Sequence, residues 1–259
     1  MVKIIGGIKI DYQITGEGRV LLLLHGWALE MSKEKYRKLV GELAKKYKVV
    51  ALDFPGFGGS SLPPKPWGVR EYADLVASFV NALNLRVFGI VGHSFGGRIA
   101  IKFAVLYPER LKKLILCASA GIKHPLNFFQ KIIFKLAIFG NFLFSKRPFK
   151  RFKDVAHNFF YTFLRQKDYA KAKGIMKETL KKVLEEDLRP ELSQIKINTL
   201  LIWGEKDKAV PIKDAYLMKE HIPQSVLEII PGASHTPNLE MPEKIADIVG
   251  NFLANNKRI

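Results

Sequence analysis

A serine between two glycines carries the strongest chemical signal in this 259-residue sequence. The pentapeptide 92–96, Gly-His-Ser-Phe-Gly, directly follows the apolar run 87–91 and precedes a stretch of good helix formers. A strand that turns sharply into a helix strains the backbone at the serine, and a side chain at Gly92 or Gly96 would collide with the neighbouring strand or helix. The amides of the first helical turn point towards negative charge that develops beside the hydroxyl. We therefore predict that Ser94 is a nucleophile.

Two later loops contain the acid and the base that such a serine needs. A serine hydroxyl requires a base to take its proton, and the base requires an acid that orients it. Asp207 follows the apolar run 199–203, and His235 follows the run 226–230, so the three residues occur in the order serine, acid, histidine. Glu205 competes with Asp207, but Asp207 stands deeper in its loop. We predict a catalytic triad of Ser94, His235 and Asp207.

Acyl transfer also needs donors for the oxyanion that forms during attack. The backbone N–H of Phe95, directly after the nucleophile, is one candidate, and that of Trp27, in the turn that ends the run 20–24, is the second. His25 and His93 flank these motif residues. We expect both histidines to hold loop structure next to the substrate, and we include them among the candidate substrate-binding residues.

The elements around these residues alternate between strands and helices. Continuous apolar runs predict strands at 20–24, 48–52, 87–91, 114–117, 199–203 and 226–230, after two short strands at 3–5 and 8–15. Helical periodicity occupies 33–46, 69–83, 95–107, 213–221 and 243–255. This alternation predicts an α/β fold with a mostly parallel eight-stranded sheet that has helices on both faces. Functional residues should then gather at the carboxyl ends of the strands.

Residues 122–190 interrupt the alternation, because they show helical periodicity without a strand pattern. We predict a helical cap inserted between a first core part (1–121) and a second (191–259). The insertion contains 11 of the 18 phenylalanines. Three of them, Phe128, Phe129 and Phe134, are candidate substrate-binding residues. The apolar stretch 126–144 contains polar and charged side chains. This favours a cap helix that covers an apolar pocket, rather than a membrane helix.

The net charge of +18 is concentrated in the same segment, where 16 Lys or Arg stand against 6 Asp or Glu. A solvated basic surface is the interpretation we favour, with weak contact to an anionic membrane surface as the alternative. No zinc-finger or RNP-like motif accompanies the charge, so we expect no specific nucleic-acid partner. The single cysteine, Cys117, and an N-terminus unlike a signal peptide favour a cytoplasmic protein. The sequence leaves the oligomeric state open.

Together these blocks resemble the α/β-hydrolase superfamily, in particular its capped esterase-like and carbon-carbon hydrolase-like members. The matching blocks are 25–27 (His-Gly-Trp), 53–60 (Asp-Phe-Pro-Gly-Phe-Gly-Gly-Ser), 92–97 (Gly-His-Ser-Phe-Gly-Gly), 204–207 with 210–211, and 232–235. The resemblance implies the same triad, an oxyanion hole at Trp27 and Phe95, and no metal or organic cofactor. Related dehalogenases and epoxide hydrolases have an aspartate at the position of Ser94, so these activities are disfavoured. The resemblance also implies that Asp53 supports a loop.

The leading hypothesis is hydrolysis of carboxylic esters, including lactones or thioesters, that have an apolar acyl or alcohol part. Two alternatives use the same fold. The first is cleavage of a carbon-carbon bond next to a ketone, as in hydrolases of meta-cleavage products, with Arg189 as a candidate for binding a substrate carboxylate. The second is a non-catalytic receptor for a small molecule.

Overall fold

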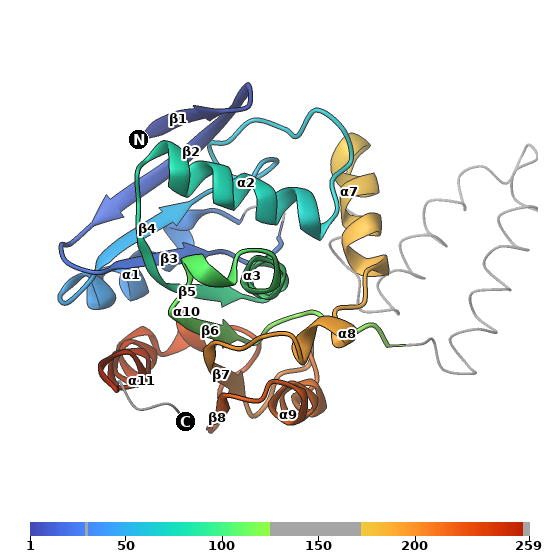
Figure 1. The fold of residues 1–259 in the computed structure, drawn as a ribbon. Helices are drawn as coiled ribbons and strands as arrows, with labels where there is room; N and C mark the ends of the chain where they lie inside the picture. Colours follow the sequence, from blue (N-terminus) through green and yellow to red (C-terminus); the bar gives the residue numbers. More distant parts are fainter. Residues whose placement is uncertain (29–30, 125–171, 256–259) are drawn as a thin grey trace, which may run out of the picture.

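The computed structural model describes residues 1–28, 31–124 and 172–255 (Figure 1). The strands are β1 (Val2–Ile5), β2 (Ile8–Thr15), β3 (Val20–Leu24), β4 (Lys48–Leu52), β5 (Val87–His93), β6 (Lys113–Cys117), β7 (Asn198–Gly204) and β8 (Ser225–Ile230). The α-helices are α1 (Arg37–Ala44), α2 (Val69–Ala82), α3 (Phe95–Leu106), α7 (Gly174–Glu185), α8 (Arg189–Leu192), α9 (Ile212–His221), α10 (Pro237–Glu240) and α11 (Pro242–Ala254). Two short 3-10 helices, η1 (Lys33–Tyr36) and η2 (Pro108–Arg110), complete the described elements.

The strands form one sheet in the order β1-β2-β4-β3-β5-β6-β7-β8. Strands β3 to β8 run parallel to one another, whereas β1 pairs with β2, and β2 with β4, in antiparallel register. The prediction of a mostly parallel eight-stranded sheet is therefore confirmed. Because the carboxyl ends of parallel strands meet at one edge, the loops after β3, β5, β7 and β8 lie at the same edge of the sheet.

Helices cover both faces of the sheet and bury two apolar layers (Figure 1). Alternate residues of one strand enter different layers: Leu22 and Leu24 of β3 pack on the side of α2, α3 and α9, and Leu21 and Leu23 pack on the side of α1 and α11. The side chains that make up both layers are buried, which explains why the strands are continuously apolar in sequence.

The predicted bounds agree closely with the observed ones. Strands β3 and β4 begin and end at the predicted residues. The helix predicted over 33–46 instead begins as the 3-10 turn η1 and continues as α1. Its first turn is set by contacts from outside the helix, since the Lys33 amide donates to Asp53 Oδ1 (2.6 Å) and the Tyr36 hydroxyl accepts from the Gly26 amide (3.0 Å).

Of the predicted insertion, residues 122–124 and 172–190 are described, and they contain α7 and the beginning of α8. The insertion's limits stay a prediction. Helix α7 lies next to the start of α2 (Figure 1), where the Trp67 amide donates to Thr179 Oγ1 (3.2 Å). Among the described residues, no helix combines the length and the apolar character that crossing a bilayer requires. The candidate residues Phe128, Phe129 and Phe134 lie outside the described residues.

Candidate active site

Ser94 occupies the sharp turn between β5 and α3, at φ 51° and ψ −108°. This is a left-handed backbone angle that L-residues rarely adopt. The turn is held by backbone hydrogen bonds, since the Ser94 amide donates to the Cys117 carbonyl (3.0 Å) and the Ser94 carbonyl accepts from the Ala120 amide (3.1 Å). The strained turn that the sequence predicted is therefore present, and its strain is supported by the neighbouring strand β6.

The two glycines beside Ser94 are required by close approach. A Cβ on Gly92 would lie 2.6 Å from the Gly96 carbonyl oxygen at the start of α3. A Cβ on Gly96 would lie 2.1 Å from the carbonyl oxygen of Leu24, at the end of β3. Both contacts are with backbone, which cannot swing aside as a side chain can. The two glycines therefore let α3 approach β5 and β3 more closely than any residue with a side chain would allow.

Gly96→Ala is expected to destabilise the protein by about 3 kcal/mol, the upper range for overpacking. For a chain of this size that corresponds to a fall in Tm of about 10 °C. Gly41→Ala is the matched control, because Gly41 also lies in a helix but has open space around its Cβ position. The control should gain about 0.5–1 kcal/mol from helix propensity. Thermal melting by circular dichroism measures both, and a Gly96→Ala protein that melts with the wild type would contradict the close approach.

The three residues of the predicted triad meet in one hydrogen-bonded line. His235 Nε2 lies 3.0 Å from Ser94 Oγ, and His235 Nδ1 lies 2.9 Å from Asp207 Oδ2. A carboxylate only accepts hydrogen bonds, so Nδ1 carries the proton and Nε2 is free to accept from the serine hydroxyl. The ring of His235 is a quarter exposed, whereas the Asp207 side chain is fully buried. This arrangement can remove a proton from Ser94.

Asp207, and not Glu205, faces the histidine. The second oxygen of Asp207, Oδ1, accepts from the amides of Ala209 (2.8 Å) and Val210 (2.9 Å), so the carboxylate cannot rotate without breaking these bonds. Glu205 is exposed, and its Oε2 accepts from the Gly232 amide (2.9 Å). The loop after β7 therefore holds one carboxylate rigidly towards His235 and turns the other outward.

The amides of Trp27 and Phe95 lie in the two turns next to Ser94. Within the described residues, no acceptor is recorded for either N–H. Phe95 is the first residue of α3, where the amide has no partner inside the helix. The indole ring of Trp27 and the phenyl ring of Phe95 contact each other edge to face, with their centroids 5.0 Å apart. The Trp27 ring also contacts the Phe57 ring, at a centroid distance of 4.8 Å. Two amide donors with no recorded acceptor in the described part of the chain thus lie beside an aromatic wall in the turns next to the serine.

His25 and His93 are buried, with both ring nitrogens of each engaged by protein groups. His25 lies 2.7 Å from the Gly26 carbonyl through Nδ1 and accepts from the Phe54 amide (3.0 Å) through Nε2. Burial lowers the pKa of His25 to about 4 and, with the nearby His235, that of His93 to about 3. Both residues therefore hold loop structure, and we assign them no polar contact with a substrate.

Asp53 supports the loop 53–60, as the resemblance implied. Its carboxylate accepts from the Lys33 ammonium (3.2 Å) and from the Gly59 amide (2.9 Å), and it is 1 % exposed. Lys33 also pairs with Asp11 (2.7 Å). This buried ion pair fixes the loop that contains Phe57 and, through η1, the chain that follows Trp27.

Two buried side chains near the site were missed by the sequence analysis. Arg98 lies one helical turn after Ser94 and donates from Nη1 to the carbonyls of Val183 (2.8 Å) and Glu186 (2.9 Å), which closes the end of α7. Burial lowers the pKa of its guanidinium to about 10. Tyr36, 1 % exposed, joins the Gly26 amide to His93. Apolar periodicity marks Tyr36 as a core residue, but nothing in the sequence marks either residue's partners.

Arg189 is occupied by a neighbouring carboxylate. Its guanidinium donates to both oxygens of Asp187, with Nε 2.8 Å from Oδ2 and 3.1 Å from Oδ1. The residue is exposed at the start of α8. Nothing in this geometry directs Arg189 towards Ser94, so it offers no support for the carboxylate-binding role considered from the sequence.

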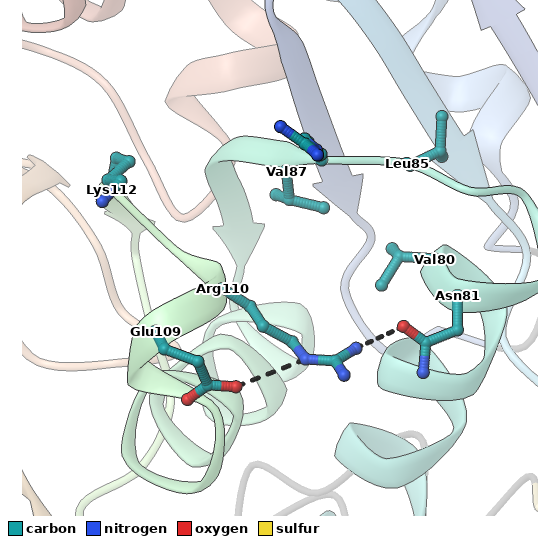
Figure 2. Close-up of a pocket in the computed structure, with 8 residues that line it drawn as sticks. Val80, Asn81, Leu85, Val87, Glu109, Arg110 and Lys112 are labelled. Atoms are coloured by element: carbon teal, nitrogen blue, oxygen red, sulfur yellow. Dashed lines mark hydrogen bonds and ion pairs between the residues drawn. The ribbon is translucent and has the colours of Figure 1, made fainter.

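One cavity of about 320 Å³ lies away from the serine (Figure 2). Residues from 80–87 and 109–112 line it, at the amino ends of β5 and β6, whereas Ser94 follows the carboxyl end of β5. Figure 2 shows its Arg110 between Glu109, at 3.3 Å, and Asn81. This cavity takes no part in the chemistry of Ser94.

Fold and site together define an α/β protein with a mostly parallel sheet. The turn that contains Ser94 and the loops that contain Asp207 and His235 meet at one edge of this sheet. The chain belongs to the α/β-hydrolase fold family, whose model matches residues 19–242.

Relatives and solved structures cover nearly the whole chain. A pimeloyl-[acyl-carrier protein] methyl ester esterase of Aeromonas hydrophila is 28% identical over 95% of this chain and 100% of its own length. A 2-hydroxy-6-oxo-6-(2'-aminophenyl)hexa-2,4-dienoic acid hydrolase of Metapseudomonas resinovorans is 26% identical over 98% of this chain and 90% of its own. The crystal structure of a serine hydrolase involved in carbazole degradation matches with a TM-score of 0.76 and 26% identity over 98% of both chains. The relatives thus include a methyl ester esterase and a hydrolase of a dienoic acid.

Proposed function

We propose that the chain is a serine hydrolase that cleaves carboxylic esters with an apolar acyl or alcohol part. The observation that carries the proposal is the hydrogen-bonded line from Ser94 Oγ through His235 to Asp207. Its distances of 3.0 Å and 2.9 Å lie in the range that a general base and its orienting acid need. Family membership supports hydrolysis as the reaction class.

The reaction proceeds in two halves. Ser94 Oγ attacks the ester carbonyl while His235 Nε2 takes its proton, and the amides of Trp27 and Phe95 stabilise the oxyanion. His235 then gives the proton to the leaving alcohol, which leaves an acyl group on Ser94. In the second half a water molecule attacks the acyl-enzyme, His235 takes the water's proton and returns it to Ser94, and the carboxylic acid departs. Asp207 fixes the tautomer of His235 and stabilises its positive charge.

Esters are our first choice of substrate for two reasons. The rings of Trp27, Phe57 and Phe95 form an apolar surface beside the nucleophile, which suits an uncharged acyl or alkyl group. Moreover, one relative along the full chain is a methyl ester esterase. The cap over the pocket and a cytoplasmic location stay predictions.

Cleavage of a carbon-carbon bond next to a ketone is the second candidate. It is favoured by the relative that hydrolyses a 2-hydroxy-6-oxo dienoic acid and is 26% identical. Such a substrate has a carboxylate that needs a cationic partner, and the residue considered for this role, Arg189, is bonded to Asp187. We therefore rank ester hydrolysis above it.

The proposal is tested by labelling and by a substrate panel. A fluorophosphonate probe should modify one residue per chain, and peptide mapping should locate it at Ser94, because only an activated serine attacks such a probe. Nitrophenyl esters of two to twelve carbons, lactones, thioesters and a 2-hydroxy-6-oxo dienoic acid then compare turnover.

We expect ester turnover well above dienoic acid turnover. The reverse order would replace esters by the carbon-carbon hydrolase candidate. Labelling of Ser94 without turnover of any substrate would favour the small-molecule receptor, and no labelling at Ser94 would refute the proposed function.

A further inference from the structure

A buried chain of hydrogen bonds joins the three loops that meet at Ser94. The Gly26 amide donates to Tyr36 Oη (3.0 Å), Tyr36 Oη lies 2.7 Å from His93 Nδ1, and His93 Nε2 lies 2.9 Å from the His235 carbonyl oxygen. Gly26 precedes Trp27 in the loop after β3, and His93 precedes Ser94. The chain therefore connects the candidate oxyanion loop, the nucleophile turn and the histidine loop.

The direction of every bond in this chain is fixed. The His235 carbonyl only accepts, so the proton of His93 is on Nε2. Nδ1 of the neutral ring is then an acceptor, and the Tyr36 hydroxyl must donate to it. The Tyr36 oxygen keeps a lone pair for the Gly26 N–H. A single arrangement of protons thus satisfies all the groups, as a buried network requires.

Burial keeps both side chains neutral. Tyr36 is 1 % exposed and His93 is 3 % exposed. Burial raises the pKa of Tyr36, and burial together with nearby His235 lowers the pKa of His93 to about 3. The packing is also tight, since a Cβ on Gly26 would lie 2.9 Å from His93 Nδ1. Neither side chain therefore changes charge between neutral pH and mild acid, and the His93 ring is closely packed against Gly26.

The histidine loop depends on this chain for its inner contact. On its outer side Glu240 accepts from the Ser234 amide (2.9 Å) and the Thr236 hydroxyl (2.8 Å), which are the residues on either side of His235. Within the described residues, the donor recorded for the His235 carbonyl is His93 Nε2. Loss of this bond would let the backbone of residue 235 shift, and the imidazole would shift with it.

We propose that Tyr36 and His93 are positioning residues, which set the imidazole of His235 against Ser94 by tying its carbonyl to the oxyanion loop. This inference rests on the proposed ester hydrolysis. A displacement of about 1 Å in a catalytic group lowers a rate by about 100-fold. Substrate binding depends on other surfaces, so kcat should fall while KM stays close to the wild-type value.

Three variants test the proposal on the full-length chain with a nitrophenyl ester. Tyr36→Phe removes the hydroxyl alone, and His93→Asn retains an acceptor near Nδ1 but is too short to reach the His235 carbonyl. Each should lower kcat about 10- to 100-fold with KM within about two-fold. His93→Gln places an amide N–H near the position of Nε2 but has no acceptor near Nδ1, so its kcat should rise above that of His93→Asn without exceeding that of Tyr36→Phe.

Thr199→Val is the matched control for loss of a buried hydroxyl. The Thr199 side chain is buried at the amino end of β7 and donates to the Ile197 carbonyl (2.8 Å), far along the strand from Asp207. It should lose stability, measured as Tm, without loss of kcat per folded molecule.

Fluorophosphonate labelling of the wild type first establishes the nucleophile, so a failure of the proposed function is seen separately. Wild-type kcat in Tyr36→Phe and His93→Asn, or an equal loss in Thr199→Val, would overturn the positioning role.

Discussion

Ser94→Ala is expected to lower kcat for a nitrophenyl ester by about a million-fold, the loss found when a triad serine is removed elsewhere. Without Oγ no acyl-enzyme forms, and His235 Nε2 has no hydroxyl to deprotonate. The fold should be unaffected, because the Ser94 backbone makes the bonds that hold the turn, and its hydroxyl does not cap α3. Steady-state kinetics measure the loss of kcat. The Tm should stay within about 2 °C of the wild-type value, which corresponds to a change of less than about 1 kcal/mol in the free energy of unfolding.

Ser119→Ala is the matched control for this variant. Ser119 is buried in the turn after β6, close to the nucleophile turn, and its hydroxyl donates to the Ala120 carbonyl (2.9 Å). Its replacement removes a serine hydroxyl from the same region without touching the imidazole. We expect kcat within about three-fold of the wild type, a change of less than about 1 kcal/mol in the barrier. Equal turnover by Ser94→Ala and the wild type would remove Ser94 from the mechanism.

The sequence was sufficient for the eight strands, for the longer helices of the core and for the three residues that meet, because each depends on local pattern. Continuous apolar runs marked β3 and β4 to the residue, since both faces of these strands are covered. The glycines at 92 and 96 marked the turn because only glycine permits the observed contacts with the Gly96 and Leu24 carbonyls. Asp207 and His235 were found because they follow strands whose carboxyl ends share one edge.

The sequence was insufficient where a side chain finds its partner across the fold. Arg98 has a position and a charge typical of an exposed helix face, yet it is 4 % exposed, because α7 covers that face and supplies carbonyls. Tyr36 has the pattern of an ordinary core aromatic, yet its hydroxyl finds partners in other loops, among them Gly26 and His93. The order of the strands, with β4 between β2 and β3, likewise depends on pairing and not on local pattern.

Asp207→Asn is expected to lower kcat by about 10⁴-fold, as the same replacement does in other triads. The structure gives the reason at the level of single atoms. Oδ1 accepts from the amides of Ala209 and Val210, so an asparagine must place its oxygen there. Its NH₂ group then occupies the position of Oδ2, 2.9 Å from His235 Nδ1. A donor at this position forces Nδ1 to accept, which moves the imidazole proton to Nε2, where it can no longer accept from Ser94.

Glu205→Gln is the control that separates this effect from a general loss of negative charge. Glu205 lies two residues away, is exposed, and accepts from the Gly232 amide through an oxygen that glutamine retains. Its kcat should stay within about two-fold of the wild type, equivalent to about 0.4 kcal/mol in the barrier. Because Asn and Asp have nearly the same shape, Asp207→Asn should keep KM and Tm close to wild-type values. A kcat that falls in Glu205→Gln and survives in Asp207→Asn would transfer the role of the orienting acid from Asp207 to Glu205.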